Sequence, residues 1–466
     1  MFNQLLLKEI RLFFQSKQFV WVSLILLLLM LLSFSAGVQN FKNAQEQYDS
    51  AIQQHKQKLE QASYWVSIEQ DVFLPPQTLS VFINGLSNDA GRKITVSGSS
   101  ELFAQDSRYS DNPILALFRT LDLEFMLTVL LPLFALVFTY SAINGERENG
   151  TLSLLFSNSV ARSTFILSKV SGTSIALITP VLLAFLLCLV VLPFIGIPFQ
   201  QADYIRIVLL FLAGIGHLLV YTFIGLGVSA VVRTSSSSFM IVLVIWILSV
   251  FILPRASVLI AGRSVEVPNQ DAIIAQKNRY RMQLFDEDRP KLSQFKPTNS
   301  KDAQATMAEF QKMMSGMSEA RAKKVNELAS KLDEDYQNKR IYRDNLALTV
   351  SQISPTAVFQ LILNKTSQTG INLSESFYEQ AKNYKTTFDN FIQEKTGQKS
   401  SGMVMIFETD EERPKLDISE IPEFSFKMPS ISATVISLQH QLILLLMYLA
   451  TSFFWAFYGF IRSDIK

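Results

Sequence analysis

The sequence predicts a polytopic α-helical membrane protein, with six transmembrane helices and a mainly helical external domain (α with minor β) built from two insertions. Six apolar runs in the 466-residue chain contain no Asp, Glu, Lys or Arg, and most reach the roughly 20 residues that a helix needs to cross a bilayer. They lack the alternation of polar and apolar residues seen in the strands of a membrane β-barrel. Helices are therefore the expected way for the backbone N–H and C=O groups to form hydrogen bonds in lipid. The runs are residues 19–38, 125–143, 170–193, 207–232, 239–253 and 435–461.

The first run, residues 19–38, is expected to be an uncleaved membrane anchor. It is longer than the roughly 7–15 residues of a signal-peptide core, which argues against cleavage near residues 33–36. Residues 1–18 interleave leucines and phenylalanines with Lys8, Arg11 and Lys17. This pattern predicts an amphipathic helix that lies in the headgroup plane and contacts membrane lipid.

Two long segments, about residues 39–124 and 254–433, together exceed half of the chain. They are too long for loops, so we expect them to form the external domain. Residues 125–253 hold the second to fifth transmembrane helices, residues 434–461 the sixth, and residues 462–466 a short tail. The fifth run reaches about 20 residues only when the uncharged residues 234–238 are added to it.

Helical patterning dominates both external segments. The first membrane helix is expected to continue through about Ile68, before Pro75 and Pro76 stop it, and residues 79–83 and 93–96 are strand-like or irregular. Residues 302–351 repeat apolar side chains at three- and four-residue steps, which predicts one long amphipathic helix, or two with a break near Gly316; residues 374–396 repeat the pattern. We favour an antiparallel helical bundle that packs on itself; the alternative is a coiled-coil arm that grips a partner, but regular heptads do not persist beyond about two.

Composition and motifs exclude several classes. A formal net charge of +2 gives no reason to expect a nucleic-acid partner, and the single cysteine, Cys188, permits no intrachain disulfide. The sequence has no phosphate-binding loop, no His-Glu-x-x-His and no Cys-x-x-Cys. We therefore expect no catalytic residues, no metal and no cofactor in this chain.

The fourth apolar run carries four glycines and a histidine. Gly214, Gly216, Gly225 and Gly227 lie inside an apolar helix, so they predict a small-residue face for close helix packing rather than a dinucleotide loop. His217 is either an interhelical hydrogen-bonding residue, which we favour, or part of a proton relay. An ion-driven carrier is disfavoured, and the energy source is expected to be another subunit.

Basic residues in the short connections predict the orientation. If six helices alternate, four basic clusters fall on the same side, and cytoplasmic loops carry such an excess. Both termini are therefore expected to be cytoplasmic, at the inner membrane of the cell, with the large domain on the periplasmic or extracellular side. The basic residues are Lys8, Arg11, Lys17, Arg147, Arg162, Lys169, Arg233, Arg462 and Lys466.

A charged, glycine-punctuated segment at about residues 144–158 lies between two membrane runs, so it must lie at a membrane surface. It reads Asn-Gly-Glu-Arg-Glu-Asn-Gly-Thr-Leu and continues to Arg162 and Lys169. It resembles the cytoplasmic E-x-E-x-G-T … V-x-R … G-K stretch of the type-2 ATP-binding-cassette (ABC) permeases, where it forms a coupling helix. Ser159 and Ser168 stand where that family often has Pro and Gly.

The resemblance implies a permease that works with cytosolic ABC ATPase subunits, which hold the ATP and Mg, and with a second copy of itself or a similar permease. The large insertion before the last helix is similar to the subgroup with a sizeable extracytoplasmic domain, which includes permeases of gliding-motility and copper-maturation gene clusters. The expected ATPase-coupling residues are Glu146, Arg147, Glu148, Gly150, Thr151, Leu152, Leu155 and Arg162.

The chemistry of these residues suits a docking role. Glu146 and Glu148 favour the positive end of a short helix, and Gly150 or Thr151 permits close approach to a groove. Arg162 and Lys169 can contact lipid headgroups or acidic groups of the ATPase; the alternative is that they serve only as topology anchors.

Two functions remain open at this point. The leading one is the permease of an ATP-driven exporter. The alternative is a non-transporting subunit that transmits ATP-driven motion to an extracytoplasmic partner protein.

Overall fold

The computed structural model describes residues 2–62, 64–65, 68–85, 92–96, 104–105, 122–157, 160–293, 303–396 and 416–463. Six helical stretches in these residues are long and apolar enough to cross a membrane, which confirms a polytopic helical membrane protein. The stretches are α2 (Lys17–Glu60); α4 (Leu123–Phe125), η4 (Met126–Leu130), α5 (Leu131–Thr139) and α6 (Asn144–Glu148); α8 (Arg162–Val191) with η5 (Leu192–Phe194); α9 (Gln201–Val231); α10 (Ser235–Ile247), η6 (Leu248–Ile252) and α11 (Leu253–Ser264); and α16 (Ile431–Arg462).

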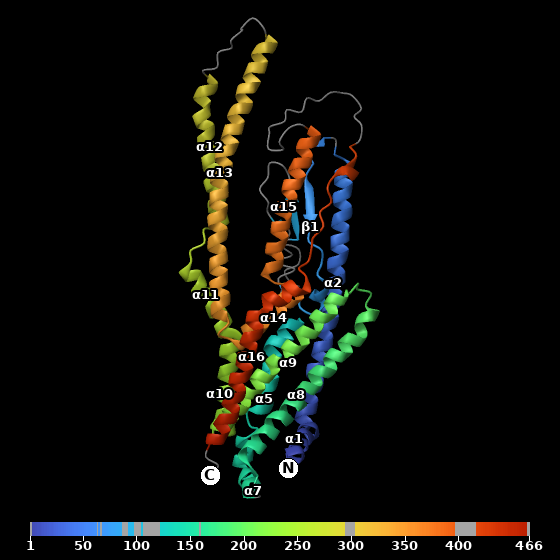
Figure 1. Cartoon of the computed structure of the whole chain (residues 1–466), viewed down its shortest axis with the longest axis vertical. Helices are drawn as coiled ribbons and strands as arrows, with labels where there is room; N and C mark the ends of the chain where they lie inside the picture. Colours follow the sequence, from blue (N-terminus) through green and yellow to red (C-terminus); the bar gives the residue numbers. More distant parts are fainter. Residues whose placement is uncertain are drawn as a thin grey trace.

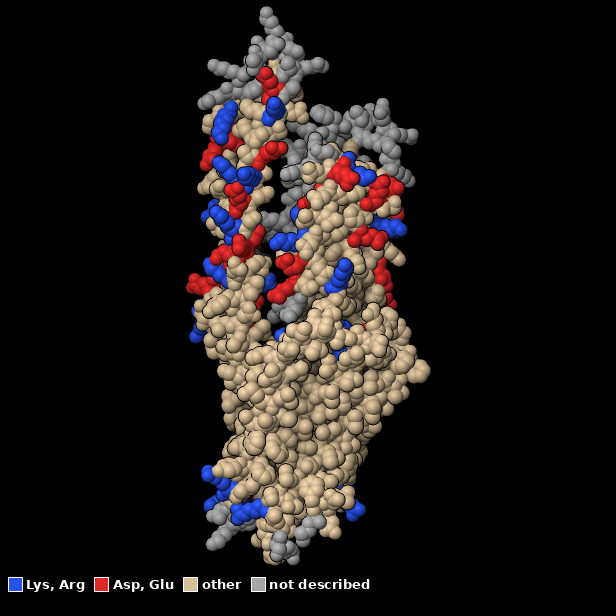
Figure 2. Space-filling view, viewed as in Figure 1, with Lys and Arg blue, Asp and Glu red and all other residues tan. Residues whose placement is uncertain are grey.

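Both termini lie at one end of the membrane bundle, together with α1 (Phe2–Gln15) and α7 (Thr151–Ser157) (Figure 1). We call this end the terminal side and the other end the opposite side. In the face shown in Figure 2, a broad band free of charged side chains separates the two ends. That band matches the hydrocarbon layer that the apolar runs predict.

Two membrane stretches differ in length from the sequence prediction. The fifth continues past Leu253 as α11 and ends at Ser264, because Pro254 falls in the first turn of α11, where a missing N–H costs little. A π-helical turn, η6, precedes this proline. The first stretch ends at Glu60 rather than near Ile68, because the chain turns there and buries Ile68 against the sheet described next.

The opposite side carries a small unit built on a three-stranded antiparallel sheet of β1 (Gln70–Phe73), β2 (Lys93–Val96) and β3 (Ala104–Gln105), in that order. The helix α15 (Ile371–Thr396) packs on this sheet through Phe377, Phe388 and Ile392. Residues 79–83 are not a strand, since η2 (Thr78–Val81) is a 3₁₀ turn.

Asp71 is the buried charge of the sheet unit. Burial alone would raise its pKa, but hydrogen bonds from His55, from the Thr95 hydroxyl at 2.6 Å and from Lys93, whose Nζ is also the nearest positive charge, hold that pKa well below its usual range. The carboxylate therefore joins the end of α2 to β2.

A second unit on the opposite side is the hairpin of α12 (Gln270–Ser293) and α13 (Ala303–Ser351), which stands beside the sheet unit (Figure 1). The predicted long helix over residues 302–351 is confirmed by α13. The expected bundle is wrong in its membership, because α13 packs on α11 and α12 while α15 packs on the sheet. The two helices α13 and α15 therefore pack against different elements.

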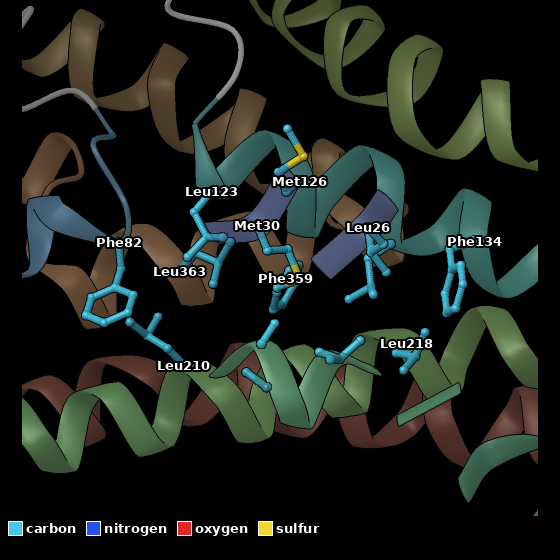
Figure 3. Close-up of a cluster of buried hydrophobic side chains, with 14 of the residues drawn as sticks. Leu26, Met30, Phe82, Leu123, Met126, Phe134, Leu210, Leu218, Phe359 and Leu363 are labelled. Carbon is cyan, nitrogen blue, oxygen red and sulfur yellow. The ribbon is translucent and has the colours of Figure 1, made fainter. Parts of the chain in front are cut away.

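The short helix α14 (Pro355–Ser367) lies among the membrane helices, against α9, α16 and η6. Its side chains Phe359 and Leu363 are fully buried and belong to the main apolar core (Figure 3). A polar cluster fixes its start: the Tyr221 hydroxyl contacts Thr356 Oγ1 at 2.6 Å and Ser249, and Ser354 donates to the Ser249 carbonyl at 2.6 Å. The remaining described element is η7 (Ile418–Glu420).

Candidate functional site

The segment expected to be one helix over residues 144–158 is two short helices, α6 and α7, joined at Gly150. Gly150 has φ of 70°, a left-handed conformation that glycine adopts without strain, and its N–H bonds the Arg147 carbonyl. The start of α6 is held by the Ser229 hydroxyl of α9, which accepts from the N–H groups of Ile143 and Asn144 and donates to the Asn144 side chain. The chain therefore reverses direction at a fixed point on the terminal side.

Glu146 is internal, which differs from the expected solvent-facing docking residue. Its carboxylate lies 2.9 Å from the ammonium of Lys169 on α8, and the same ammonium lies 2.9 Å from the carboxylate of Glu9 on α1. Side-chain exposure is 6% for Lys169 and Glu9 and 17% for Glu146, with Lys8 at 3.9 Å as an outer, exposed partner. The short helix α6 directs the Glu146 side chain toward α8, so the ion pairs connect α6, α8 and α1.

We call Glu9, Lys169 and Glu146 the ion triad. The close approach of α1 to α8 that it requires depends on Gly172, where an added Cβ would lie 2.7 Å from the Glu9 Cβ. Removing one partner of a buried ion pair typically costs about 3–5 kcal/mol, because the remaining charge stays buried. The triad therefore stabilises the contacts among α1, α6 and α8.

The two arginines of the segment contact helix ends in the same chain. Arg147 donates to the Ala230 carbonyl at the end of α9 and to Ser463 beyond α16, and Arg162 donates to the Ile461 carbonyl at 2.8 Å. Cations at helix C-termini complement the negative end of the helix dipole. Arg162 is also exposed, so it keeps contact with solvent in addition to this contact within the chain.

Glu148 is exposed, and it caps the start of α10: its carboxylate accepts from the Ser235 N–H at 2.8 Å and from the Ser235 hydroxyl at 2.6 Å. A carboxylate at a helix N-terminus is a stabilising cap. Both acidic residues of the segment thus have partners within the chain.

The most exposed apolar side chain among the described residues of the segment lies at the tip of α7. Leu154 is 68% exposed and stands beside the exposed Thr151 and Ser153, while Leu152 is 1% exposed and packs into the core of the terminal side. Leu155 is half-buried against the same core, which contains Phe165 and Phe460. Gly150 has no atom within 4 Å of its Cβ position, so the turn itself presents open backbone. We call Gly150, Thr151, Ser153 and Leu154 the α7 tip.

A comparison with protein families decides the class. The family model described as ABC-2 family transporter protein matches residues 4–465, nearly the whole chain. The chain belongs to the ABC-2 transporter family. It is therefore the transmembrane permease component of an ABC transporter, a component generally not catalytic itself, and the family implies partnership with an ABC ATPase subunit. A search of curated proteins found no match.

The sequence departs from the family pattern at Ser159 and Ser168, and the structure describes only Ser168. Ser168 of the ABC-2 permease is buried in α8 and donates to the Phe165 carbonyl at 2.8 Å, so the hydroxyl is satisfied within the helix. Ser159 lies outside the residues that the structure describes.

The glycines of α9 lie against other membrane helices of the permease. A Cβ on Gly225 would lie 1.9 Å from Thr139 Oγ1 of α5, and a Cβ on Gly227 would lie 2.8 Å from the Trp455 ring of α16. Gly216 is close to Leu445, whereas Gly214 has only the Phe359 ring nearby, at 3.9 Å. Gly225 and Gly227 therefore need a small residue for close packing, whereas a Cβ at Gly216 would only make a tight contact, 3.3 Å from Leu445.

His217 is fully buried, but the interhelical hydrogen bond expected for it is absent: neither ring nitrogen has a partner among the described residues. The ring instead stacks on Phe359 of α14, with centroids 4.2 Å apart and planes 13° apart, and meets Tyr221 edge-on. Within the described residues, no group of three or more His, Cys, Asp or Glu could hold a metal ion.

Sequence reasoning missed Glu9 and the inward role of Lys169. A signal was present, since Glu9 is the one acidic residue in residues 1–18. A single carboxylate on a helix otherwise rich in apolar and basic residues is out of place at an anionic membrane surface, and it points to an internal partner.

Proposed function

We propose that this ABC-2 permease couples ATP hydrolysis by a separate cytosolic ATPase to the outward movement of an amphiphilic or polar substrate, with the α7 tip as the docking point. The observation that carries the proposal is the exposed Leu154 on a short helix whose other side is anchored by the buried Leu152. Exposed apolar side chains on a rigid support suit insertion into a pocket of a partner. The terminal side is accordingly cytoplasmic and the two external units are extracytoplasmic.

The ion triad supports this role because it connects the tip to the membrane helices. A force on α7 passes to α6, and the Glu146 carboxylate passes it to Lys169 of α8 and Glu9 of α1. Two permeases, as a homodimer or with a similar chain, would bring two such tips to a pair of ATPase subunits. ATP and Mg are held by the ATPase, so the isolated permease is expected not to hydrolyse ATP.

The docking proposal is tested with Leu154→Ser. Loss of a buried leucine contact of about 2 kcal/mol weakens docking by more than tenfold, so co-purification of the cognate ATPase and its stimulated activity should fall together. The matched control is Met307→Ser, at a 70% exposed apolar side chain on α13. Wild-type retention and stimulation in Leu154→Ser, with monodisperse elution, would remove the docking role.

A second function has one observation in its favour. The 49-residue helix α13 is followed after three residues by α14, which is buried among the membrane helices. Motion of the membrane helices would reach the α12–α13 hairpin through this junction and act on an extracytoplasmic protein. Amphiphile-stimulated ATPase activity and vesicle uptake favour export; hydrolysis that depends on an external protein, with nothing crossing the bilayer, favours transmission.

A further inference from the structure

The helix α11 carries the fifth membrane stretch out of the hydrocarbon layer, toward the base of the α12–α13 hairpin (Figure 1). Residues 234–254 contain no charged side chain, and the helical part of this run, residues 235–254, is about 30 Å long. The hydrocarbon layer has the same thickness, about 30 Å. Arg255 is the first charged residue after the run, so it lies at the headgroup level of the opposite side. Arg263 lies about 12 Å farther along the helix.

Between the two arginines, α11 turns an apolar face outward. The residues of this face follow one another at three- and four-residue steps and so lie on one side of the helix: Arg255, Val258, Leu259 and Arg263. Val258 is 62% exposed and Leu259 is 67% exposed. Gly262, on the same side, has no atom within 4 Å of its Cβ position. The residues that the structure describes therefore leave this face open.

The two arginines are the only charged residues of α11, and both are exposed. Neither forms a hydrogen bond or an ion pair with a residue that the structure describes. The next acidic residue along the chain, Glu266, comes after the helix has ended. Ser257 and Ala261, on the side away from the arginines, are each 1% exposed, and α13 packs on α11. The outward face thus combines unpaired positive charge with branched aliphatic side chains.

The direction of α11 favours contact between these arginines and lipid. Side chains of an α-helix lean toward its N-terminus, which is the membrane end of α11. The apolar stem of Arg263 can therefore lie along Leu259 while its guanidinium reaches toward the headgroups, as long basic side chains do near the ends of membrane helices. A planar guanidinium binds phosphate through two parallel hydrogen bonds.

A second copy of the chain fits this face less well. In a pair related by a two-fold axis along the membrane normal, a shared face lies against its own copy. Arg255 and Arg263 would then approach the same arginines of the other chain, and like charges across an interface cost free energy. An anionic lipid surface complements both the charges and the apolar side chains between them.

We propose that the outward face of α11 binds anionic phospholipids in the leaflet on the opposite side. Arg255 and Arg263 contact the phosphate oxygens, and Val258 and Leu259 lie against the glycerol and the upper part of the acyl chains. Each basic residue that contacts an anionic membrane surface enriches such a lipid about fivefold. This face lies across the membrane from the α7 tip, so the proposal does not depend on the docking role.

The test measures which lipid touches this face. The full chain carries a bimane fluorophore on Leu259→Cys in a Cys188→Ala background, in nanodiscs that hold phosphatidylglycerol and phosphatidylcholine in equal amounts. A nitroxide quencher near the headgroup end of the acyl chain is placed on one lipid or on the other. The quenching slope with labelled phosphatidylglycerol should exceed that with labelled phosphatidylcholine about fivefold or more.

A fluorophore at Val190→Cys is the matched control for position. Val190 is 64% exposed near the end of α8 on the opposite side, and residues 170–205 contain no Lys or Arg. The two lipids should quench it equally. A slope ratio near one at Leu259→Cys as well would refute the preference for anionic lipid. Absence of quenching by either lipid there would show that protein covers the face, as a second copy would, and would also overturn the proposal.

Charge variants test the arginines themselves. The pair Arg255→Gln and Arg263→Gln should lower the slope ratio at Leu259→Cys to the value at Val190→Cys. The control pair, Arg279→Gln and Arg281→Gln, removes the same charge from exposed positions on α12 and should leave the ratio unchanged. Each single α11 variant decides the case if the pair does not elute as a single species. A wild-type ratio in the folded α11 variants, or an equal fall in the control pair, would sink the proposal.

Discussion

Replacing Lys169 by methionine tests the ion triad directly. The change removes the ammonium but leaves the carboxylates of Glu9 and Glu146, each 2.9 Å from the same nitrogen in the wild type. They can therefore be no farther apart than about 6 Å, and two like charges at that separation repel by about 3 kcal/mol at an effective dielectric constant of 20. Together with the lost pairing, the expected cost is about 3–5 kcal/mol.

This cost should appear as undocking of α1 from α8, because α1 is the short, terminal partner. Hydrogen exchange of the α1 amides, measured by mass spectrometry in nanodiscs, should accelerate by about two to four orders of magnitude. The control is Lys58→Met, which breaks a 2.9 Å ion pair with Glu69 whose side chains are 58% and 50% exposed. Exposed pairs contribute only about 0–1 kcal/mol, so this variant should exchange as the wild type does.

Neutralising the whole triad separates charge from packing. The triple variant Lys169→Met, Glu9→Gln and Glu146→Gln removes the uncompensated charges, and replacing a complete buried ion group is often close to neutral in stability. Protection of α1 should therefore return toward the wild-type value. If Lys169→Met protects α1 as well as the wild type, or if the triple variant is no better than the single one, the triad does not hold α1 in place.

Three further outcomes follow from the structure. Gly225→Leu should destabilise the bundle by at least about 1–3 kcal/mol through overpacking, seen as a lower thermal midpoint, whereas Gly262→Leu should not; equal midpoints would contradict the close α9 contact. Because the pKa of Asp71 is lowered in the folded protein, its stabilisation is fully present above the unfolded pKa of about 4 and is lost as the pH falls below that value. Hydrogen exchange of the sheet unit should show this loss in the wild type but not in Asp71→Asn. In a background without the native cysteine, cysteines at Ser153 and Met307 should label from opposite sides of the membrane, and labelling of both from one side would overturn the topology.

The membrane helices were predictable because lipid imposes a simple rule. An uncharged run of about 20 residues has few alternatives to a spanning helix, and the part of the chain that the structure describes contains six helices of that kind. The long α13 was predictable for a related reason, since its residues 303–351 keep one apolar period without a proline. What each amphipathic helix packs against was not predictable, because periodicity identifies an apolar face but not its partner.

Residues 144–158 show where sequence reasoning reached its limit. Their position at a membrane surface followed from the flanking apolar runs, but the break at Gly150, where the backbone is left-handed, was not expected. The direction of each charged side chain did not follow, because Glu146 and Glu148 are two positions apart and face different partners on a short helix. Lys169 points to α1 and α6 only because α8 begins at Arg162, a boundary that the charge-free run at residues 170–193 did not reveal.

The helix α2 runs unbroken from the membrane bundle to the sheet unit. Its 44 residues include no proline and correspond to about 66 Å of helix. A tilt of about 5° at its membrane end would swing the far end by about 6 Å over that length. A small tilt in the bilayer therefore moves the sheet unit farther than it moves the membrane helices. A spectroscopic label near His55 would detect such a tilt better than one placed among the membrane helices.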